Sequence, residues 1–165
     1  MAQQTIGLGA APNDGSGDTL RDAGAKINAN FTELYGISGA ANQVVSLLIT
    51  DPNGSALTTG DGKAFFRVPD TLDGMSLVAV AAAVTTVSSS GAVSVALYNV
   101  DQADDLLTTN VTIDASEKDS MDAATPAVTD TAILLATGDQ IRVDIDGAGT
   151  GAKGLMVEMQ FAFVS

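Results

Sequence analysis

The sequence contains no histidine, cysteine or tryptophan, and only 7 basic residues against 20 acidic ones. Without histidine there is no Ser-His triad, imidazole base or histidine-ligated zinc. Without cysteine there is no thiolate nucleophile, disulfide or cysteine-ligated metal. These absences leave a binding or structural protein, or an enzyme that works with carboxylates alone.

The net charge of -13 also restricts the partners of the chain. An acidic surface repels phosphate backbones and anionic lipids, so neither nucleic acid nor a membrane is an expected partner. The longest apolar run, 77–84, is far shorter than the ~20 residues of a membrane span. The first residues lack the basic start and apolar run of a secretion signal, so none is expected.

The N-terminal region is predicted to be an arm followed by one helix. Residues 1–18 are rich in glycine and small polar residues, which predicts an extended arm or turn region that is mobile unless a partner holds it. Thr19 and Asp22 then form a variant of the capping box, and Gly36 is predicted to end a helix of about 16 residues. A helix this short is marginal alone, so its apolar stripe should pack on the chain's own β domain, on copies of itself or on another protein. The stripe comprises Leu20, Gly24, Ile27, Phe31 and Leu34.

From Val44 onward, short apolar runs alternate with turn residues, as is typical of strands. Eight strands without a second helix predict a mainly β fold, an antiparallel jelly-roll-like sandwich preceded by the arm and one short α-helix. The expected domains are residues 1–38, an anchoring arm and helix, and residues 39–165, the β-sandwich. The expected strands are 44–49, 64–68, 76–87, 92–100, 106–113, 132–136, 140–145 and 155–164.

One predicted strand is apolar at every position from 77 to 84, which a strand with one wet face does not need. One explanation is a second buried face at a subunit interface, with Val78, Val80 and Ala82 as candidates and small alanines permitting close approach. The other is a central strand covered by a loop. The acidic stretch 114–130 is expected to form a long loop that wraps a sheet edge or reaches a neighbour.

Candidate chemistry is sparse. Paired carboxylates can hydrolyse glycosidic bonds, but the acidic clusters at 101–105, 114–122 and 144–146 fall mostly in predicted loops, and aromatics make up only 4% of the chain. Asp144 and Asp146 resemble the start of a calcium loop without its later ligands, which leaves a cation at a subunit axis as an alternative. The glycine-rich stretches 7–12 and 147–154 depart from nucleotide-binding patterns. The chain is therefore predicted to have no catalytic residues, metal or cofactor, with a glycan-binding or glycan-cleaving module as the remaining alternative.

Two segments resemble proteins of tailed-phage virions. The stretch PNDGSGDTLRD at 12–22, continued by KINANFTELY at 26–35, is similar to an N-terminal segment of fibre and head-decorating proteins. The stretches GDGKAFFRVP at 60–69 and LDGMSL at 72–77 are similar to parts of a small domain in phage proteins. The sequence departs from the first pattern at Gly24, where a bulkier residue would strengthen the stripe.

The resemblance implies a non-enzymatic virion structural protein, usually trimeric, whose N-terminal segment attaches to the particle. The first expectation is a capsid decoration, cement or head-fibre protein, and the alternative is a short tail fibre or tail adapter that binds a host surface. The implied partners are copies of the chain in a homotrimer and the major capsid protein or another virion protein. The implied location is the virion, after synthesis in the host cytoplasm. The residues expected to anchor the chain or form the trimer seam are Ile6, Leu8, Leu20, Ile27, Phe31 and Leu34.

Overall fold

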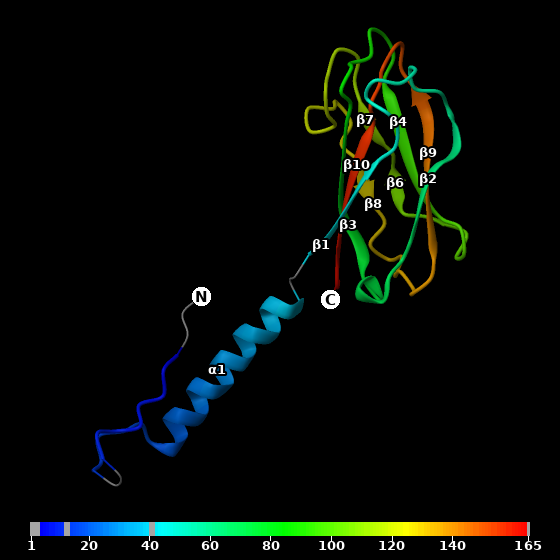
Figure 1. Cartoon of the computed structure of the whole chain (residues 1–165). Helices are drawn as coiled ribbons and strands as arrows, with labels where there is room; N and C mark the ends of the chain where they lie inside the picture. The colour runs from blue at the N-terminus through cyan, green and yellow to red at the C-terminus, as the bar shows by residue number, and fades with distance from the viewer. Residues whose placement is uncertain (1–3, 12–13, 40–41, 165) are drawn as a thin grey trace. The chain divides into compact units, whose positions relative to one another are not determined.

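The computed structural model describes residues 4–11, 14–39 and 42–164. The chain divides into two compact units, Met1–Ala41 and Asn42–Ser165 (Figure 1). The first unit consists of a leader and the helix α1, Leu20–Gly39. The predicted end of this helix at Gly36 is wrong. A glycine inside a helix costs about 1 kcal/mol but does not by itself stop the backbone from continuing.

The second unit is built from antiparallel sheets. The small sheet has the order β1-β10-β3, from Gln43–Leu48, Met156–Ala162 and Ser76–Ala83. The large sheet has the order β2-β9-β4-β5, from Gly60–Arg67, Gln140–Ala148, Val93–Asn99 and Asp104–Asp105, and β7, Val111–Ile113, also pairs with β4. A ribbon of β6, Leu107–Thr109, and β8, Val128–Thr129, and a 3-10 turn, Asp70–Leu72, complete the unit.

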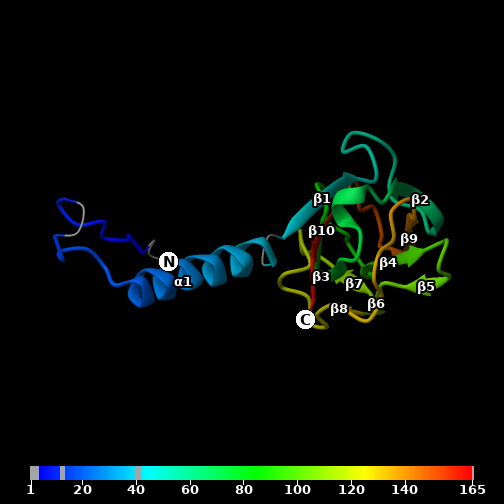
Figure 2. The ribbon, with the colours of Figure 1, turned by 90° about the horizontal axis from the view of Figure 1, so that it is seen from below.

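The small and large sheets lie face to face and enclose the hydrophobic core (Figure 2). Phe66 of β2 and Phe161 of β10 meet across the core with ring centroids 6.1 Å apart. The prediction of a mainly β chain with antiparallel pairing and one helix is confirmed. The core side chains contributed by β4, β9 and β10 are Val93, Val95, Leu97, Ile141, Val143, Ile145, Val157, Met159 and Phe161.

One predicted strand, 132–136, is absent from the described residues. Leu135 is nevertheless a core residue with 2% of its surface exposed. Its amide donates to the Met75 carbonyl, and its own carbonyl accepts from the Gly74 amide, both at 2.8 Å. These two backbone hydrogen bonds hold Leu135 beside Gly74 and Met75. Its side chain is therefore buried although its segment is a loop and not a strand.

The acidic loop wraps the edge of β3, which confirms one of its two expected roles. The Val84 amide donates to the Lys118 carbonyl at 2.8 Å, and the Ser120 amide donates to the Ala82 carbonyl at 2.9 Å. The Ser120 hydroxyl also accepts from the Ala82 amide at 2.9 Å. These bonds satisfy backbone groups that an open sheet edge would expose.

Candidate binding surfaces

The helix begins as the capping pattern predicts. The Asp22 amide donates to the Thr19 hydroxyl oxygen at 3.1 Å, and that hydroxyl donates to the Asp22 carboxylate at 2.6 Å. Thr19 therefore satisfies one of the amides that every helix start leaves free, while the Asp22 charge lies at the positive end of the helix dipole. In the described part of the chain, no helix is long and apolar enough to cross a membrane.

The leader folds back on the helix, which agrees with the turn region and not with the extended arm, the two alternatives expected for this segment. The Asp18 carboxylate accepts from the Lys26 ammonium and from the Gly7 amide, each at 2.7 Å, and the Asp18 amide donates to the Gly7 carbonyl at 2.8 Å. Lys26 also donates to the Thr5 carbonyl at 3.0 Å. The hydrogen bond from Lys26, and then that from Gly7, lowers the pKa of Asp18 below its usual value.

A second carboxylate closes the tip of the leader. One Asp14 oxygen accepts from the Ala10 and Ala11 amides at 2.9 and 2.7 Å, and the other accepts from the Ser16 amide at 2.9 Å. Hydrogen bonds from Ser16, first through its amide and then through its side chain, and from the alanine amides lower the pKa of Asp14 to about 2. The aspartates of the PNDGSGD segment thus act as acceptors for a closed loop.

Close backbone approach explains one glycine of this segment. A Cβ atom on Gly17 would lie 2.9 Å from the Gly7 carbonyl oxygen and 3.0 Å from the Gly9 nitrogen. Both neighbours are backbone atoms and cannot turn aside, so only glycine fits. Glycine at this position therefore permits the close packing of a folded leader.

The leader leaves the apolar stripe of the helix exposed. It contacts α1 through Lys26 and through Asn30, which exchanges two hydrogen bonds of 2.9 Å with the Gln4 backbone. With 3.6 residues per turn, these two positions lie on the flank of the stripe. Ile6 is half-buried. The exposed fractions of the other expected anchoring residues are 89% for Leu8, 91% for Leu20, 41% for Ile27, 52% for Phe31 and 57% for Leu34.

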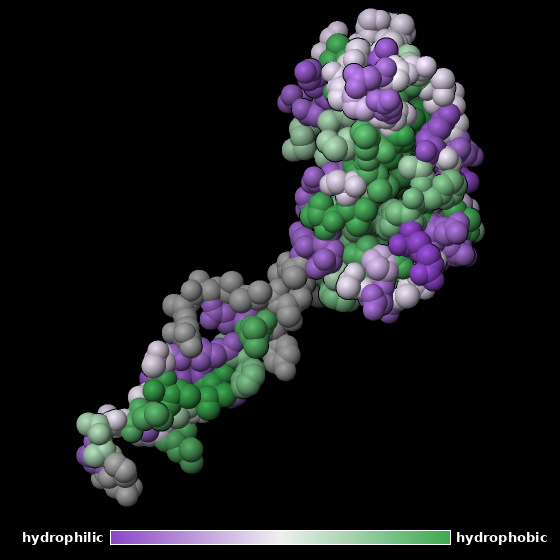
Figure 3. Space-filling model, viewed as in Figure 1, coloured by the Kyte–Doolittle hydropathy of each residue, from purple (hydrophilic) through white to green (hydrophobic). Residues whose placement is uncertain are grey.

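Three of the helix side chains line one apolar hollow on the first unit. Ile27, Phe31 and Leu34 line, together with Asn30, a shallow hollow of about 230 Å³. Figure 3 shows apolar side chains along the helix. Lipophilic groups this exposed are typical of a surface that binds another protein. We call Leu20, Ile27, Phe31 and Leu34 the helix stripe.

The second candidate surface is the outer face of the small sheet. Phe161 pairs with Leu77 and Gln160 with Ala79, so Val78 is an extra residue that forms a β-bulge. Beyond the bulge the side chains change faces. Val80 packs half-buried against the core and Ala82 is 3% exposed within it, while Ala79, Ala81 and Ala83 are on the outer face.

The structure therefore brings alanines other than the predicted ones to the surface of β3. Val78 is half-buried at the bulge. Sequence reasoning missed Ala79, Ala81 and Ala83 because a strand that is apolar throughout has no alternation from which a change of face can be read. The one available signal was the run of small side chains itself.

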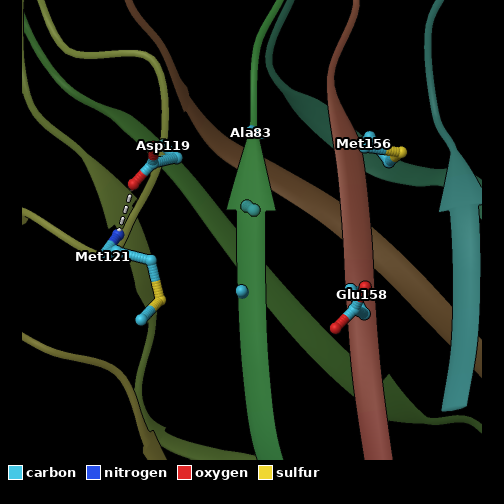
Figure 4. A pocket seen from close by; sticks show the side chains of 7 residues that line it. Ala83, Asp119, Met121, Met156 and Glu158 are labelled. Atoms are coloured by element: carbon cyan, nitrogen blue, oxygen red, sulfur yellow. Dashed lines mark hydrogen bonds between the residues drawn. The ribbon is translucent and has the colours of Figure 1, made fainter.

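Two methionines border these alanines and make a groove. Met121, 80% exposed, rises from the acidic loop on one side of β3, and Met156 and Glu158 rise from β10 on the other (Figure 4). The hollows along this groove measure about 240 and 310 Å³. We call this surface the alanine groove. It is formed by Ala79, Ala81, Ala83, Met121, Met156 and Glu158.

The acidic cluster at 144–146 is engaged in structural bonds. Asp144, 5% exposed, accepts from Arg142 at 2.8 Å and from the Gly62 amide at 2.7 Å. The bond to Asp144 raises the pKa of Arg142, whose guanidinium also lies 4.7 Å from the centre of the Tyr98 ring. Asp146 accepts from Asn110 at 2.7 Å. Among the described residues, no group of three acidic side chains is placed to hold a metal ion.

A mainly β unit with an apolar groove, preceded in sequence by a folded leader and a helix with an exposed apolar stripe, has the features of a structural protein that assembles with other proteins. The family model "Bacteriophage T4 gp9/10-like protein, N-terminal" matches residues 3–147, and the chain belongs to this family of phage virion structural proteins. The match extends over both units. Neither the curated proteins nor the solved structures gave a match.

Proposed function

We propose that this protein is a trimeric, non-enzymatic component of the virion surface, a capsid decoration, cement or head-fibre protein that attaches through its N-terminal unit. The observation that carries this proposal is the exposure of the helix stripe, together with Leu8, in a unit whose leader binds the helix through Lys26 and Asn30 and leaves the stripe uncovered. Burying such side chains contributes about 1.5–3 kcal/mol each, so they favour a protein partner.

The two parts of the N-terminal unit suit different tasks. Leu8 lies near the leader tip and, with Ile6, is proposed to contact the major capsid protein or another virion protein. The stripe has spacings of four and three residues, as in a coiled-coil seam, and is proposed to join the three helices. Three linked copies of a weak contact hold far better than one, because each bound copy raises the effective concentration of the others.

The alternative is a short tail fibre or tail adapter that binds a host surface. It is favoured by the family itself, which is fibre-related. Copy number in purified virions separates the two locations: a shell protein is present in hundreds of copies, and a tail protein in tens or fewer. The protein would be assembled into either structure after synthesis in the host cytoplasm.

Attachment is tested by adding the full-length protein to virions of a mutant phage that lacks it and measuring co-sedimentation. Leu8→Asp and Leu34→Asp should lose most of the bound protein, because each places a charge in an apolar contact. Thr32→Asp, on the same helix outside the stripe, is the matched control and should bind as the wild type does. Equal binding by all three variants would exclude attachment through these side chains.

A further inference from the structure

The alanine groove combines an apolar floor with a carboxylate on each side. Glu158 of β10 pairs with Ala81, and Asp119 of the acidic loop forms a bridge with Ala83 on the other side of β3 (Figure 4). Side chains on one face of a strand recur at every second residue, so the two carboxylates are one such step apart along β3. Both line the hollow of about 240 Å³. A ligand in the groove is therefore flanked by negative charge on both sides.

The two carboxylates have no basic partner in the described part of the chain. No ion pair there includes Asp119 or Glu158. Lys118 comes directly before Asp119, but it lines neither hollow of the groove. One Asp119 oxygen accepts from the Met121 amide at 2.8 Å, and this bond fixes the carboxylate at the rim without neutralising it. By charge complementarity, the groove favours an occupant that carries positive charge.

The remaining surface of the groove is apolar and adaptable. Its two hollows share Ala81, Met121 and Glu158, so they form one groove along β3. Met121 is 80% exposed and Met156 is 46% exposed. Methionine is flexible and polarizable, which suits a surface that packs against a partner's side chains. The stem of a lysine or arginine can pack on such apolar groups while its charged head reaches a carboxylate.

The acidic loop also restricts how a partner can bind. The Val84 amide donates to the Lys118 carbonyl, and Ser120 exchanges two hydrogen bonds with the Ala82 backbone. These bonds occupy the backbone groups at this end of β3, so an added strand cannot pair there. Recognition must therefore come from side chains that enter the groove from the open face of the sheet.

We propose that the alanine groove binds a basic segment of another virion protein, with the head of a lysine or arginine between Asp119 and Glu158 and its stem over Ala81. A second copy of the chain does not fit this chemistry, because it carries 20 acidic residues against 7 basic ones. The groove lies within the second unit. This inference therefore goes beyond the proposed attachment through the N-terminal unit, and it applies to a monomer as well as to a trimer.

The methionines of the groove provide the readout for a binding test. The full-length protein with isotope-labelled methionine methyl groups is titrated to millimolar concentration with an acetylated, amidated peptide of sequence Ala-Leu-Arg-Leu-Ala. The NMR signals of Met121 and Met156 should shift, and those of the core residues Met75 and Met159 should not. Citrulline in place of arginine keeps the shape of the peptide and removes its charge, so binding should weaken about fivefold. Equal binding of both peptides, or no shift of Met121 and Met156, would overturn the inference.

Variants of the groove separate the effect of charge from that of shape. Glu158→Gln and Asp119→Asn each remove one charge and should weaken binding of the arginine peptide about threefold. Asp105→Asn, at an exposed position on β5, is the control and should not weaken it. Ala81→Leu fills the groove and should abolish the methionine shifts with unchanged circular dichroism, whereas Ala96→Leu on the outer face of the large sheet should keep them. Groove variants that bind as well as these controls would contradict the proposed site.

Cross-linking identifies the partner in the particle. The full-length protein with a photoreactive side chain at position 121 is assembled into virions, and the cross-linked peptides are sequenced by mass spectrometry. The expected cross-link joins position 121 to a segment of another virion protein that contains lysine or arginine. A cross-link to a second copy of this chain, a cross-link to a segment without a basic residue, or no cross-link in virions that contain the protein would each refute the proposal.

Discussion

The Lys26 ammonium lies 2.7 Å from the Asp18 carboxylate, and this pair links the second turn of the helix to the residue just before its cap. Lys26 also donates a hydrogen bond to the Thr5 carbonyl, so one side chain binds the leader at two points. Lys26→Met keeps the length of the stem and removes the donors. We expect amide exchange at Gly7 to become several-fold faster, measured by NMR. Arg21→Met is the control, and equal exchange in both variants would contradict the role of the pair.

The leader should open in acid. Because hydrogen bonds to the charged forms hold the pKa of Asp14 at about 2 and that of Asp18 below its usual value, folding of the leader is favoured while both are ionised. This contribution is fully present above the unfolded value of 3.8 and is lost as the pH falls through the folded values. The NMR shifts of the Ala11 and Ser16 amides should therefore move to their unfolded positions below pH 3.8. A transition above about pH 5 would assign the opening to other groups.

Two glycines of the N-terminal unit should respond in opposite ways to alanine. At Gly17 the new Cβ would meet two backbone atoms, so the leader must open. At Gly24 nothing lies within 4 Å of the new Cβ, and alanine should stabilise the helix by about 1 kcal/mol. Amide exchange of the leader and the helical circular dichroism measure the two effects. Protection of the leader in Gly17→Ala would show that the backbone can move apart at little cost.

A buried polar network should make Asp139 important for stability. Asp139 is 8% exposed and accepts from Asn99, which is fully buried, at 2.7 Å and from Gln102 at 2.6 Å. Burial raises its pKa, but these bonds and one from the Ala136 amide outweigh burial and lower it. Asp139→Ala should therefore cost about 1–3 kcal/mol at neutral pH, because it leaves buried donors unpaired. Urea unfolding measures the loss, and Asp104→Ala at an exposed position should change the free energy of unfolding by less than about 0.5 kcal/mol.

The same network adds a pH dependence. Since the folded pKa of Asp139 lies below the unfolded one, its stabilisation is complete above 3.8 and disappears as the pH falls through the folded value. The difference in unfolding free energy between wild type and Asp139→Ala should therefore shrink on acidification. A difference that stays constant down to pH 2 would mean that the carboxylate charge is not what the donors require.

Local rules predicted the parts of the fold that are fixed by local contacts. The Thr19 cap and most strands of the β unit follow from capping chemistry and from alternation, because neighbouring residues determine both. The closed leader was missed because its bonds join residues up to 26 positions apart, as between Gln4 and Asn30. Leu135 was misassigned because an apolar run records burial but not the backbone partner that produces it.

Of the two candidate surfaces, one could be predicted from local sequence and the other could not. The helix stripe could be read from its spacing, and the structure leaves its apolar side chains exposed. The groove could not be read, because the bulge at Val78 reverses the faces of β3 and an apolar strand contains no mark of the reversal. Register between strands is set by pairing with β10, which lies about 80 residues away in the sequence, and local pattern cannot supply it.

The bulge can be tested directly by leucine substitutions on either side of the strand. Ala82 is 3% exposed and pairs with the fully buried Val157 across the strands, so Ala82→Leu must force extra volume into a packed core. We expect a loss of about 1–3 kcal/mol in the free energy of unfolding. Ala79→Leu adds the same atoms on the outer face and should cost less than about 0.5 kcal/mol in the dissociated chain. Without the bulge, Ala79 would share the inward face of Leu77, and the larger loss would follow the substitution at Ala79. Chemical unfolding of both variants at concentrations below assembly distinguishes the two registers, since it measures packing within one chain.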